Sequence, residues 1–244
     1  MAERAGHEVV NENEGERLMI PNDAGRTAAQ LTLRVKELEA RSARTRASII
    51  CAFNQMLDLK DLNTGCHSTR LAEWGVRVAR DLGADESCLT DIEVAALLHD
   101  IGKVGIPDAI LHKTQQLSEE EWSLMKKHPE YGWAVVRLLP DFERASLFVL
   151  HHHERWDGGG YPAGLKGSET PLPARIVSVI DAFDAMTSNR PYRKGLPFEE
   201  AIRRLVTSKH TQFDPEVVDC FIRRAEEERS DVFAATGTGL AVAV

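Results

Sequence analysis

The sequence predicts an all-α fold. Apolar residues recur at intervals of three and four through most of the 244-residue chain, which is the spacing of one face of a helix. Glycine, proline and capping residues stand at the ends of these periodic segments, and no convincing run alternates apolar and polar residues as a strand would. The length suits one good-sized domain with extensions.

The chain begins with a polar segment and continues into a helix. Residues 1–25 have no periodicity that could bury a face, so we expect a mobile N-terminal segment. In residues 26–53, Leu31, Val35 and Leu38 are spaced by four and three, which predicts a long helix or two collinear ones. Its narrow apolar stripe suits pairing with a second copy, as a homodimer, or with an upstream sensor domain, and a solvated helix is the alternative.

Residues 54–228 are expected to form the main helical domain, and residues 229–244 a loose C-terminal tail. Each helix in the domain has its own start or stop signal: Gly83 ends the first, Thr90–Glu93 has the pattern of a capping box, and Pro215 stands in a first turn. The expected helices are Cys66–Leu82, one from Thr90 to His99, one opened by Ser118, Glu130–Leu139, Glu143–His151, one from near Pro173 to Met186, one after Pro197 and one begun by Asp214.

Charge and composition narrow the class of partner. A net charge of -8 argues against broad binding to nucleic acid polymers or anionic membranes. No apolar run approaches the ~20 residues of a membrane span, and the N-terminus lacks the apolar region of a secretory signal. The four cysteines include no Cys-x-x-Cys pair, which favours a reduced, cytoplasmic protein. An anionic partner would therefore be small and locally recognised.

Several histidines and two aspartates stand in apolar, periodic segments. Taken singly, each histidine is best explained as a hydrogen-bonded core residue. Together, burying so many titratable groups without a cation would be costly. Nitrogen and oxygen donors without thiolates are typical of a two-metal hydrolytic centre and exclude zinc ribbons and iron–sulfur clusters. The residues are His67, His99, His128, His152, His153, Asp100 and Asp181; His128 precedes Pro129, so we expect a backbone bend that presents its ring.

These residues fall within motifs that resemble a known family. The motifs are His99–Pro107, Lys127–Glu130, His152–Pro162 and Asp181–Thr187, together with Arg190–Arg193 and Thr211–Pro215. In this order, over about Asn54–Arg224, they resemble the HD-GYP phosphodiesterases of the HD superfamily, which are all-helical, metal-dependent and hydrolyse the bacterial second messenger cyclic di-GMP. The resemblance implies an HD-superfamily helical bundle with a dinuclear metal centre, preceded by the N-terminal helix.

The resemblance also implies two sets of metal ligands. His67, His99, Asp100 and Asp181 would hold one metal, with Asp100 bridging, and His128, His152 and His153 the second. Some relatives have a glutamate four residues before the first histidine that ligates a third metal. Here that position is Asn63, a poorer ligand for a hard cation. We therefore predict two divalent ions, iron or alternatively manganese; His151 is expected to be orientational or exposed, and His7, His112 and His210 to be non-ligands.

Roles in substrate binding follow from the same resemblance. Lys103 would face the phosphate or the metal-bound water and stabilise developing negative charge. Tyr161 and Gly160 would shape a wall for a guanine or ribose, a simple tight turn being the alternative for the glycines. Arg190 and Arg193 would grip phosphates, and Asp184 would contact the substrate or orient a metal ligand.

The implied reaction is hydrolysis of cyclic di-GMP. A metal-bridging hydroxide would attack a phosphorus and open the ring to linear pGpG, which some relatives convert further to GMP. Three alternatives stay open: a cyclic di-GMP receptor with weak or no catalysis that signals through protein partners, a mixed purine cyclic dinucleotide as substrate, and an HD-scaffold di-iron oxygenase.

Overall fold

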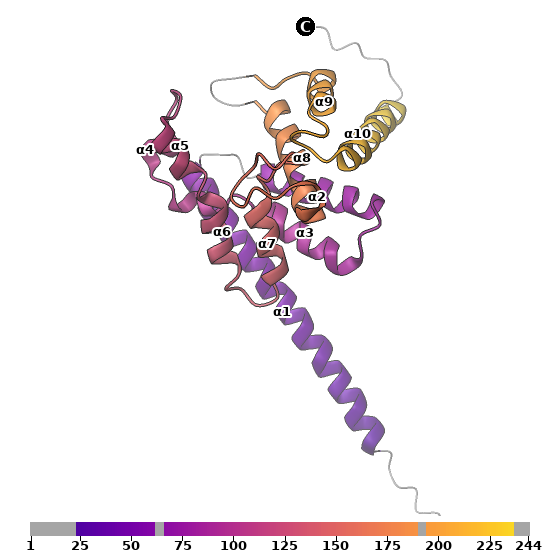
Figure 1. The fold of residues 1–244 in the computed structure, drawn as a ribbon. Coiled ribbons are helices and arrows are strands. Elements are labelled where there is room, and N and C mark those ends of the chain that lie inside the picture. Colours follow the sequence, from indigo (N-terminus) through magenta and orange to yellow (C-terminus); the bar gives the residue numbers. More distant parts are fainter. Residues whose placement is uncertain (1–22, 62–65, 190–193, 237–244) are drawn as a thin grey trace, which may run out of the picture. The chain divides into compact units, whose positions relative to one another are not determined.

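The computed structural model describes residues 23–61, 66–189 and 194–236, and it is helical throughout (Figure 1). Within these ranges the recorded β feature is one isolated bridge between Lys209 and Phe213. The predicted all-α class is confirmed. The helices are α1 (Asp23–Asp61), α2 (Cys66–Asp81), α3 (Glu86–Leu98), the 3-10 helix η1 (Ile101–Gly105), α4 (Asp108–Leu111), α5 (Glu119–Met125), α6 (His128–Val136), α7 (Glu143–His151), the 3-10 helix η2 (Gly167–Glu169), α8 (Leu172–Thr187), α9 (Phe198–Thr207) and α10 (Pro215–Thr236).

Residues 1–46 and 47–244 form two separate compact units, and the division falls within α1. Helix α1 runs without interruption to Asp61, past the expected boundary at 53. In the first unit, Leu31, Val35 and Leu38 are 61%, 52% and 48% exposed, so the predicted stripe has no covering partner within the described chain. No helix in the described ranges combines the length and apolarity needed to cross a bilayer.

The second unit has two apolar cores, and α3 contributes to both. Helix α3 is apolar on most sides, and its exposed residues, Glu86, Ser87, Thr90 and Glu93, all precede its last turn. Its Ile92 packs in a core with α2, α8 and α10, whereas its Leu98 packs in a core with α6, α7 and the last turns of α1. Figure 1 shows α3 between α2 and α7 accordingly. Both cores therefore meet at the end of α3, where His99 and Asp100 follow.

The start of α3 differs from the prediction. The helix begins at Glu86, and the Asp85 side chain accepts a hydrogen bond from the Cys88 backbone N–H at 2.8 Å. The predicted capping box at Thr90 is wrong, because the Thr90 hydroxyl lies inside the helix and donates to the Glu86 carbonyl oxygen. Asp85 caps one turn earlier, which lets the buried Leu89 join the helix.

Two other helix starts match their signals, and one differs. Ser118 and Glu121 form a reciprocal capping box at α5, and Asp214 accepts from the Glu216 N–H at 2.8 Å at the start of α10. His128 is the first residue of α6 rather than part of a bend. Pro129 is tolerated next to it because a first-turn N–H has no helical acceptor to lose.

Candidate metal centre

Ends of four helices bring the five predicted histidines to one interior point. Two groups of side chains have candidate ligand atoms within 4.8 Å of one another. Asp100 is a member of both groups, which therefore form one continuous centre. The first group is His67, His99 and Asp100, and the second is Asp100, His128, His152 and His153.

Helix-end carbonyl groups set the orientation of three of the rings. In each case Nδ1 lies within hydrogen-bond distance of the carbonyl oxygen three residues earlier, in the last turn of a helix where carbonyls lack helical partners. A carbonyl oxygen can only accept, so Nδ1 carries the proton, and in the neutral ring Nε2 keeps an open lone pair. The pairs are His99 with Ala96 at 2.8 Å, His128 with Met125 at 2.9 Å and His152 with Val149 at 2.6 Å.

The resulting lone pairs face one another in the interior. Nε2 of His128 lies 3.4 Å from Nε2 of His152 and 3.3 Å from Oδ1 of Asp100, while the buried Nε2 of His99 makes no hydrogen bond. Burial lowers the pKa of His152 well below its usual value and, with His128, lowers the pKa of His153 to about 4. His152 and His153 are therefore neutral near pH 7, whereas at His99 burial is outweighed by the Asp100 carboxylate, which raises the pKa of that ring. Facing lone pairs and a carboxylate without a bridging proton fit a divalent cation.

Two further aspartates lie at the first group. Asp181 Oδ1 is 3.3 Å from His67 Nε2 and 3.9 Å from His99 Nε2. Asp184 Oδ2 lies 2.5 Å from the other nitrogen of His67, and Arg70 Nε donates to Asp184 Oδ1 at 2.8 Å. Burial alone would lower the pKa of His67, but the two carboxylates outweigh it and raise that pKa to about 9.

Asp184 thus has the geometry of a group that orients a metal ligand, one of the two roles expected for it. Sequence reasoning missed Arg70, which holds Asp184. Its position three residues after His67 in α2 places both on one helix face, and that spacing is the signal that could have found it.

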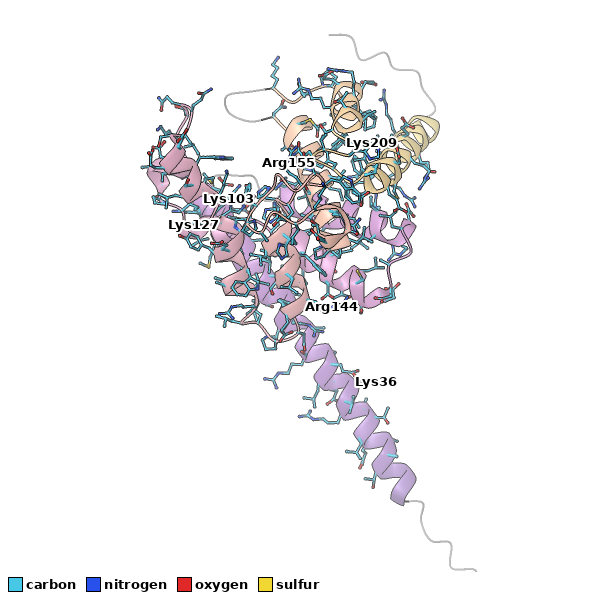
Figure 2. All side chains as sticks on the ribbon, in the orientation of Figure 1. Lys36, Lys103, Lys127, Arg144, Arg155 and Lys209 are labelled. Carbon is cyan, nitrogen blue, oxygen red and sulfur yellow. The ribbon has the colours of Figure 1, made fainter. Side chains whose placement is uncertain are left out.

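Lys103, labelled in Figure 2, lies in η1, three residues after Asp100, the carboxylate common to both ligand groups. Its Nζ is 2.7 Å from Asp100 Oδ2 and 2.9 Å from Asp61 Oδ2. Burial opposes its charge, but Asp100 and then Asp61 raise the pKa of Lys103 above its usual value. Burial likewise opposes ionisation of Asp100, yet Lys103 and His99 hold its pKa well below the usual range. A fixed ammonium therefore stands beside the shared carboxylate.

The glycine-rich loop places Tyr161 against the second group. The Tyr161 and His153 rings lie with centroids 5.0 Å apart and planes at 31°. Burial, followed by the nearby Asp100 and Asp181 carboxylates, raises the pKa of Tyr161, so its hydroxyl stays a donor at neutral pH. A Cβ at Gly160 would lie 2.4 Å from the backbone nitrogen of Arg155. Close backbone approach accounts for Gly160 without the substrate, and its predicted contact with a base stays a prediction.

Glu154 anchors this loop, a role that sequence reasoning missed. Its fully buried carboxylate accepts from the backbone N–H groups of Ala163 at 2.7 Å and Leu165 at 3.1 Å. His151, expected to be orientational, lies with Nδ1 3.5 Å from Glu154 Oε1. An acidic residue directly between the histidine pair and a loop with four glycines in seven residues is the signal that could have indicated this anchor.

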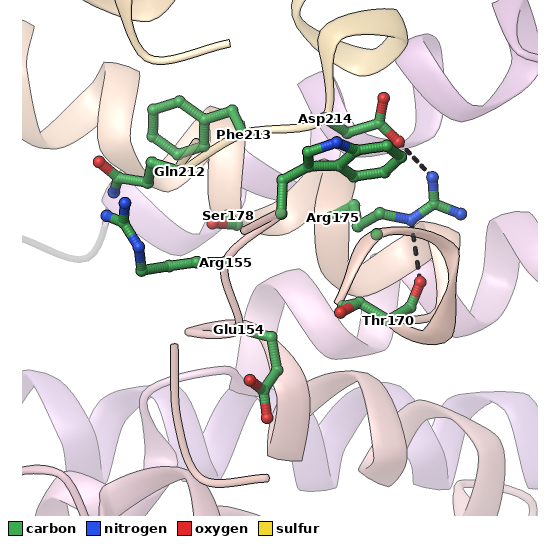
Figure 3. Close-up of a pocket in the computed structure, with 10 residues that line it drawn as sticks. Glu154, Arg155, Thr170, Arg175, Ser178, Gln212, Phe213 and Asp214 are labelled. Atoms are coloured by element: carbon green, nitrogen blue, oxygen red, sulfur yellow. Dashed lines mark hydrogen bonds and ion pairs between the residues drawn. The ribbon is translucent and has the colours of Figure 1, made fainter. Parts of the chain in front are cut away.

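A small cavity behind the loop is structural (Figure 3). There Arg175 donates to the Thr170 carbonyl oxygen at 2.9 Å, pairs with Asp214 and lies 5.6 Å from the Trp156 ring. The backbone N–H of Trp156 donates to the Gln212 carbonyl oxygen at 3.1 Å. The cavity has room for about one water molecule. The Thr211–Pro215 motif therefore supports the Tyr161 loop from behind.

Four positions singled out in the sequence lie outside the described residues: His7, Asn63, Arg190 and Arg193.

Comparison with known proteins agrees with this geometry. The HD domain family profile matches residues 52–217. A cyclic di-GMP phosphodiesterase of Thermotoga maritima is 42% identical over 183 residues, which is 74% of this chain and 50% of that protein. The 3'3'-cGAMP-specific phosphodiesterase 3 of Vibrio cholerae is 38% identical over 173 residues, covering 71% of this chain and 37% of that protein.

A solved structure shares the fold. The crystal structure of a cyclic GMP-AMP-specific phosphodiesterase from V. cholerae superposes with a TM-score of 0.59 at 21% identity, over 74% of this chain and 49% of that one. The chain thus spans about half, or less, of the length of the relatives it matches. It belongs to the HD domain family, and the predicted resemblance to the HD-GYP phosphodiesterases is confirmed.

Proposed function

We propose that this chain is a metal-dependent phosphodiesterase that hydrolyses cyclic di-GMP to linear pGpG with two metal ions, iron or manganese. The observation that carries the proposal is the membership of Asp100 in both ligand groups. A carboxylate common to two clusters of imidazoles is what a two-metal phosphoesterase requires. Similarity to phosphodiesterases of cyclic dinucleotides supports the substrate class.

In this proposal each metal has its own ligands in addition to Asp100. When bound, two divalent ions lower the pKa of coordinated water and offset negative charge on phosphoryl oxygens. The chain's contribution is to hold the imidazole lone pairs and the carboxylates ready in a water-poor interior. One set is His67, His99, Asp100 and Asp181, and the other is Asp100, His128, His152 and His153.

Other side chains are assigned to the substrate. Lys103 holds a positive charge beside Asp100, where it stabilises negative charge that develops on the phosphoryl group. Tyr161 offers a ring face for a guanine or ribose and a protonated hydroxyl as a donor. Arg190 and Arg193 are assigned to the phosphates by their motif.

The test is a product assay under anaerobic conditions. The protein is loaded with Fe²⁺ or Mn²⁺ and incubated with cyclic di-GMP and, separately, with 3'3'-cGAMP, and products are separated by chromatography. We expect pGpG from cyclic di-GMP, no turnover by the double variant His99→Ala, Asp100→Ala, and normal turnover by His112→Ala, which lies outside both ligand groups. Unchanged hydrolysis in the double variant would overturn the assignment.

The same assay separates the alternative functions. The second candidate substrate, 3'3'-cGAMP, is favoured by the 38% identity to the V. cholerae enzyme. Turnover of that nucleotide alone would correct the substrate and keep the reaction. Tight binding of cyclic di-GMP without turnover by the fully loaded protein would favour a receptor, and dioxygen consumption would favour an oxygenase.

We also propose that α1 pairs with a second copy of the chain. The exposed Leu31, Val35 and Leu38 follow the spacing of a coiled-coil seam on the largely polar first half of the helix. Light scattering on the wild type and on a Leu31→Asp, Leu38→Asp variant tests this. We expect a dimer and a monomer, respectively; a monomeric wild type would contradict the proposal.

A further inference from the structure

The last turn of α1 is tied to the segment that carries the central carboxylate. Lys60 forms an ion pair with Asp108, at the start of α4. The next residue, Asp61, accepts from Lys103 Nζ at 2.9 Å. The Asp61 and Lys103 side chains are only 13% and 20% exposed, so water screens this second pair weakly. Two consecutive residues of α1 thus hold the middle of η1 and the first residue of α4.

One ammonium group is shared between two carboxylates. Lys103 Nζ lies 2.7 Å from Asp100 Oδ2 and 2.9 Å from Asp61 Oδ2. A lysine ammonium has three protons and can donate to both at once. Asp61 offsets the charge of Lys103 and draws it toward α1. Without Asp61, the whole charge of Lys103 would rest on Asp100, where it competes with a cation for the carboxylate oxygens and repels that cation.

We propose that Asp61 is a positioning residue of the hydrolytic centre, which acts through Lys103 to set both the cation affinity of the Asp100 groups and the place of the Lys103 ammonium. The position of the last turn of α1 is thereby transmitted to the centre. The part of the proposal that concerns substrate rests on the proposed phosphodiesterase function; the part that concerns cation affinity does not.

The test measures Mn²⁺ affinity of the full chain by calorimetry, alongside kcat and KM for cyclic di-GMP. Asp61→Asn is expected to weaken Mn²⁺ binding about 10-fold or more, as the loss of a group that orients a metal-site residue typically does. It is also expected to lower kcat by a larger factor than it changes KM. Asp61→Glu, which keeps the charge, is expected to recover most of the affinity and serves if the Asn variant does not fold.

Matched controls separate this role from a general anchoring of α1. Lys60→Met breaks the neighbouring ion pair at the same helix end, and Asp58→Asn removes a carboxylate from the preceding turn; both are expected to bind Mn²⁺ as the wild type does. In a Lys103→Met background, Asp61→Asn should have little further effect on Mn²⁺ affinity, because the proposal routes the effect of Asp61 through Lys103.

Two results would overturn the inference: wild-type Mn²⁺ affinity in Asp61→Asn, or an equal loss in Lys60→Met. A wild type that binds Mn²⁺ and leaves cyclic dinucleotides intact would refute the proposed function instead, while the Mn²⁺ titrations would still decide the role of Asp61.

Discussion

Replacing Gly102 by alanine should pull the two ligand groups apart. A Cβ on Gly102 would lie 1.9 Å from the His128 carbonyl oxygen and 2.5 Å from the Gly132 backbone nitrogen. Carbon and oxygen atoms in such contacts normally stay about 3.3 Å apart. The backbone of η1 must therefore move from the start of α6 by about 1.4 Å, the difference between the two separations. Backbone atoms rather than flexible side chains block the way, so no rotamer change can relieve the contact.

This movement acts directly on the centre, because Asp100 precedes η1 and His128 begins α6. Their side-chain atoms are 3.3 Å apart, and a further separation of this size would break a shared cation site. A displacement of about 1 Å can cost ~100-fold in rate, and overpacking of this kind costs about 1–3 kcal/mol of stability. We expect Gly102→Ala to lose at least ~100-fold in turnover. We also expect it to bind one of the two metal ions weakly or not at all.

The assay combines elemental analysis after anaerobic purification, Mn²⁺ titration, turnover and urea unfolding. Gly75→Ala, in the middle of α2, is the control, because its Cβ would meet side chains rather than backbone: Ile92 at 3.0 Å and Ile180 at 4.0 Å. The control should keep metal content and turnover. A folded Gly102→Ala variant with wild-type metal affinity and turnover would refute the reasoning.

Three further predictions concern the loop and the metals. Glu154→Ala removes the buried carboxylate that accepts from the N–H groups of Ala163 and Leu165; at about 1.5–3 kcal/mol for each hydrogen bond to a charged group, urea unfolding should show a loss of at least ~3 kcal/mol, and limited proteolysis should cut the Tyr161 loop faster, whereas an unchanged cleavage pattern would contradict the anchor. The Arg155 side chain and then the Gly159 N–H lower the pKa of Asp157 to about 2, so its stabilisation is present above the ordinary pKa and lost as pH falls toward 2; the stability gap between wild type and Asp157→Asn should narrow as pH falls from about 4 to about 2, and a constant gap would be inconsistent with this. Saturating Mn²⁺ at a hundred times its Kd should stabilise the wild type by about 2.7 kcal/mol, and a chelator should reverse the rise in Tm; an equal rise in Asp100→Ala would argue against the site.

The helical class and the histidine cluster were predictable for related reasons. Apolar residues spaced by three and four define a helix face locally. His67, His99 and His152 stand at the ends of such faces, close in the sequence to the apolar residues that orient them. The start of α3 was harder to predict. Asp85 and Thr90 both have the sequence pattern of a helix cap, and only the burial of Leu89 in the folded chain decides between them.

The sequence offers local signals for the supporting residues, but it does not show what they bind. Glu154 stands beside the glycine-rich loop and binds backbone N–H groups, which nearly every residue has, so no pattern marks the two that it reaches. Asp61 meets Lys103 across 42 positions, and Arg70 meets Asp184 across 114. Pairings at such separations depend on how helices pack, which single-sequence periodicity does not encode.

The number of metal ions per chain in single-site variants tests the central claim most directly. Elemental analysis of anaerobically loaded protein should give two equivalents for the wild type, about one for His67→Ala, about one for His153→Ala and fewer than one for Asp100→Ala, because only Asp100 serves both groups. Two equivalents retained in Asp100→Ala, or none in the wild type, would contradict a centre built on one shared carboxylate.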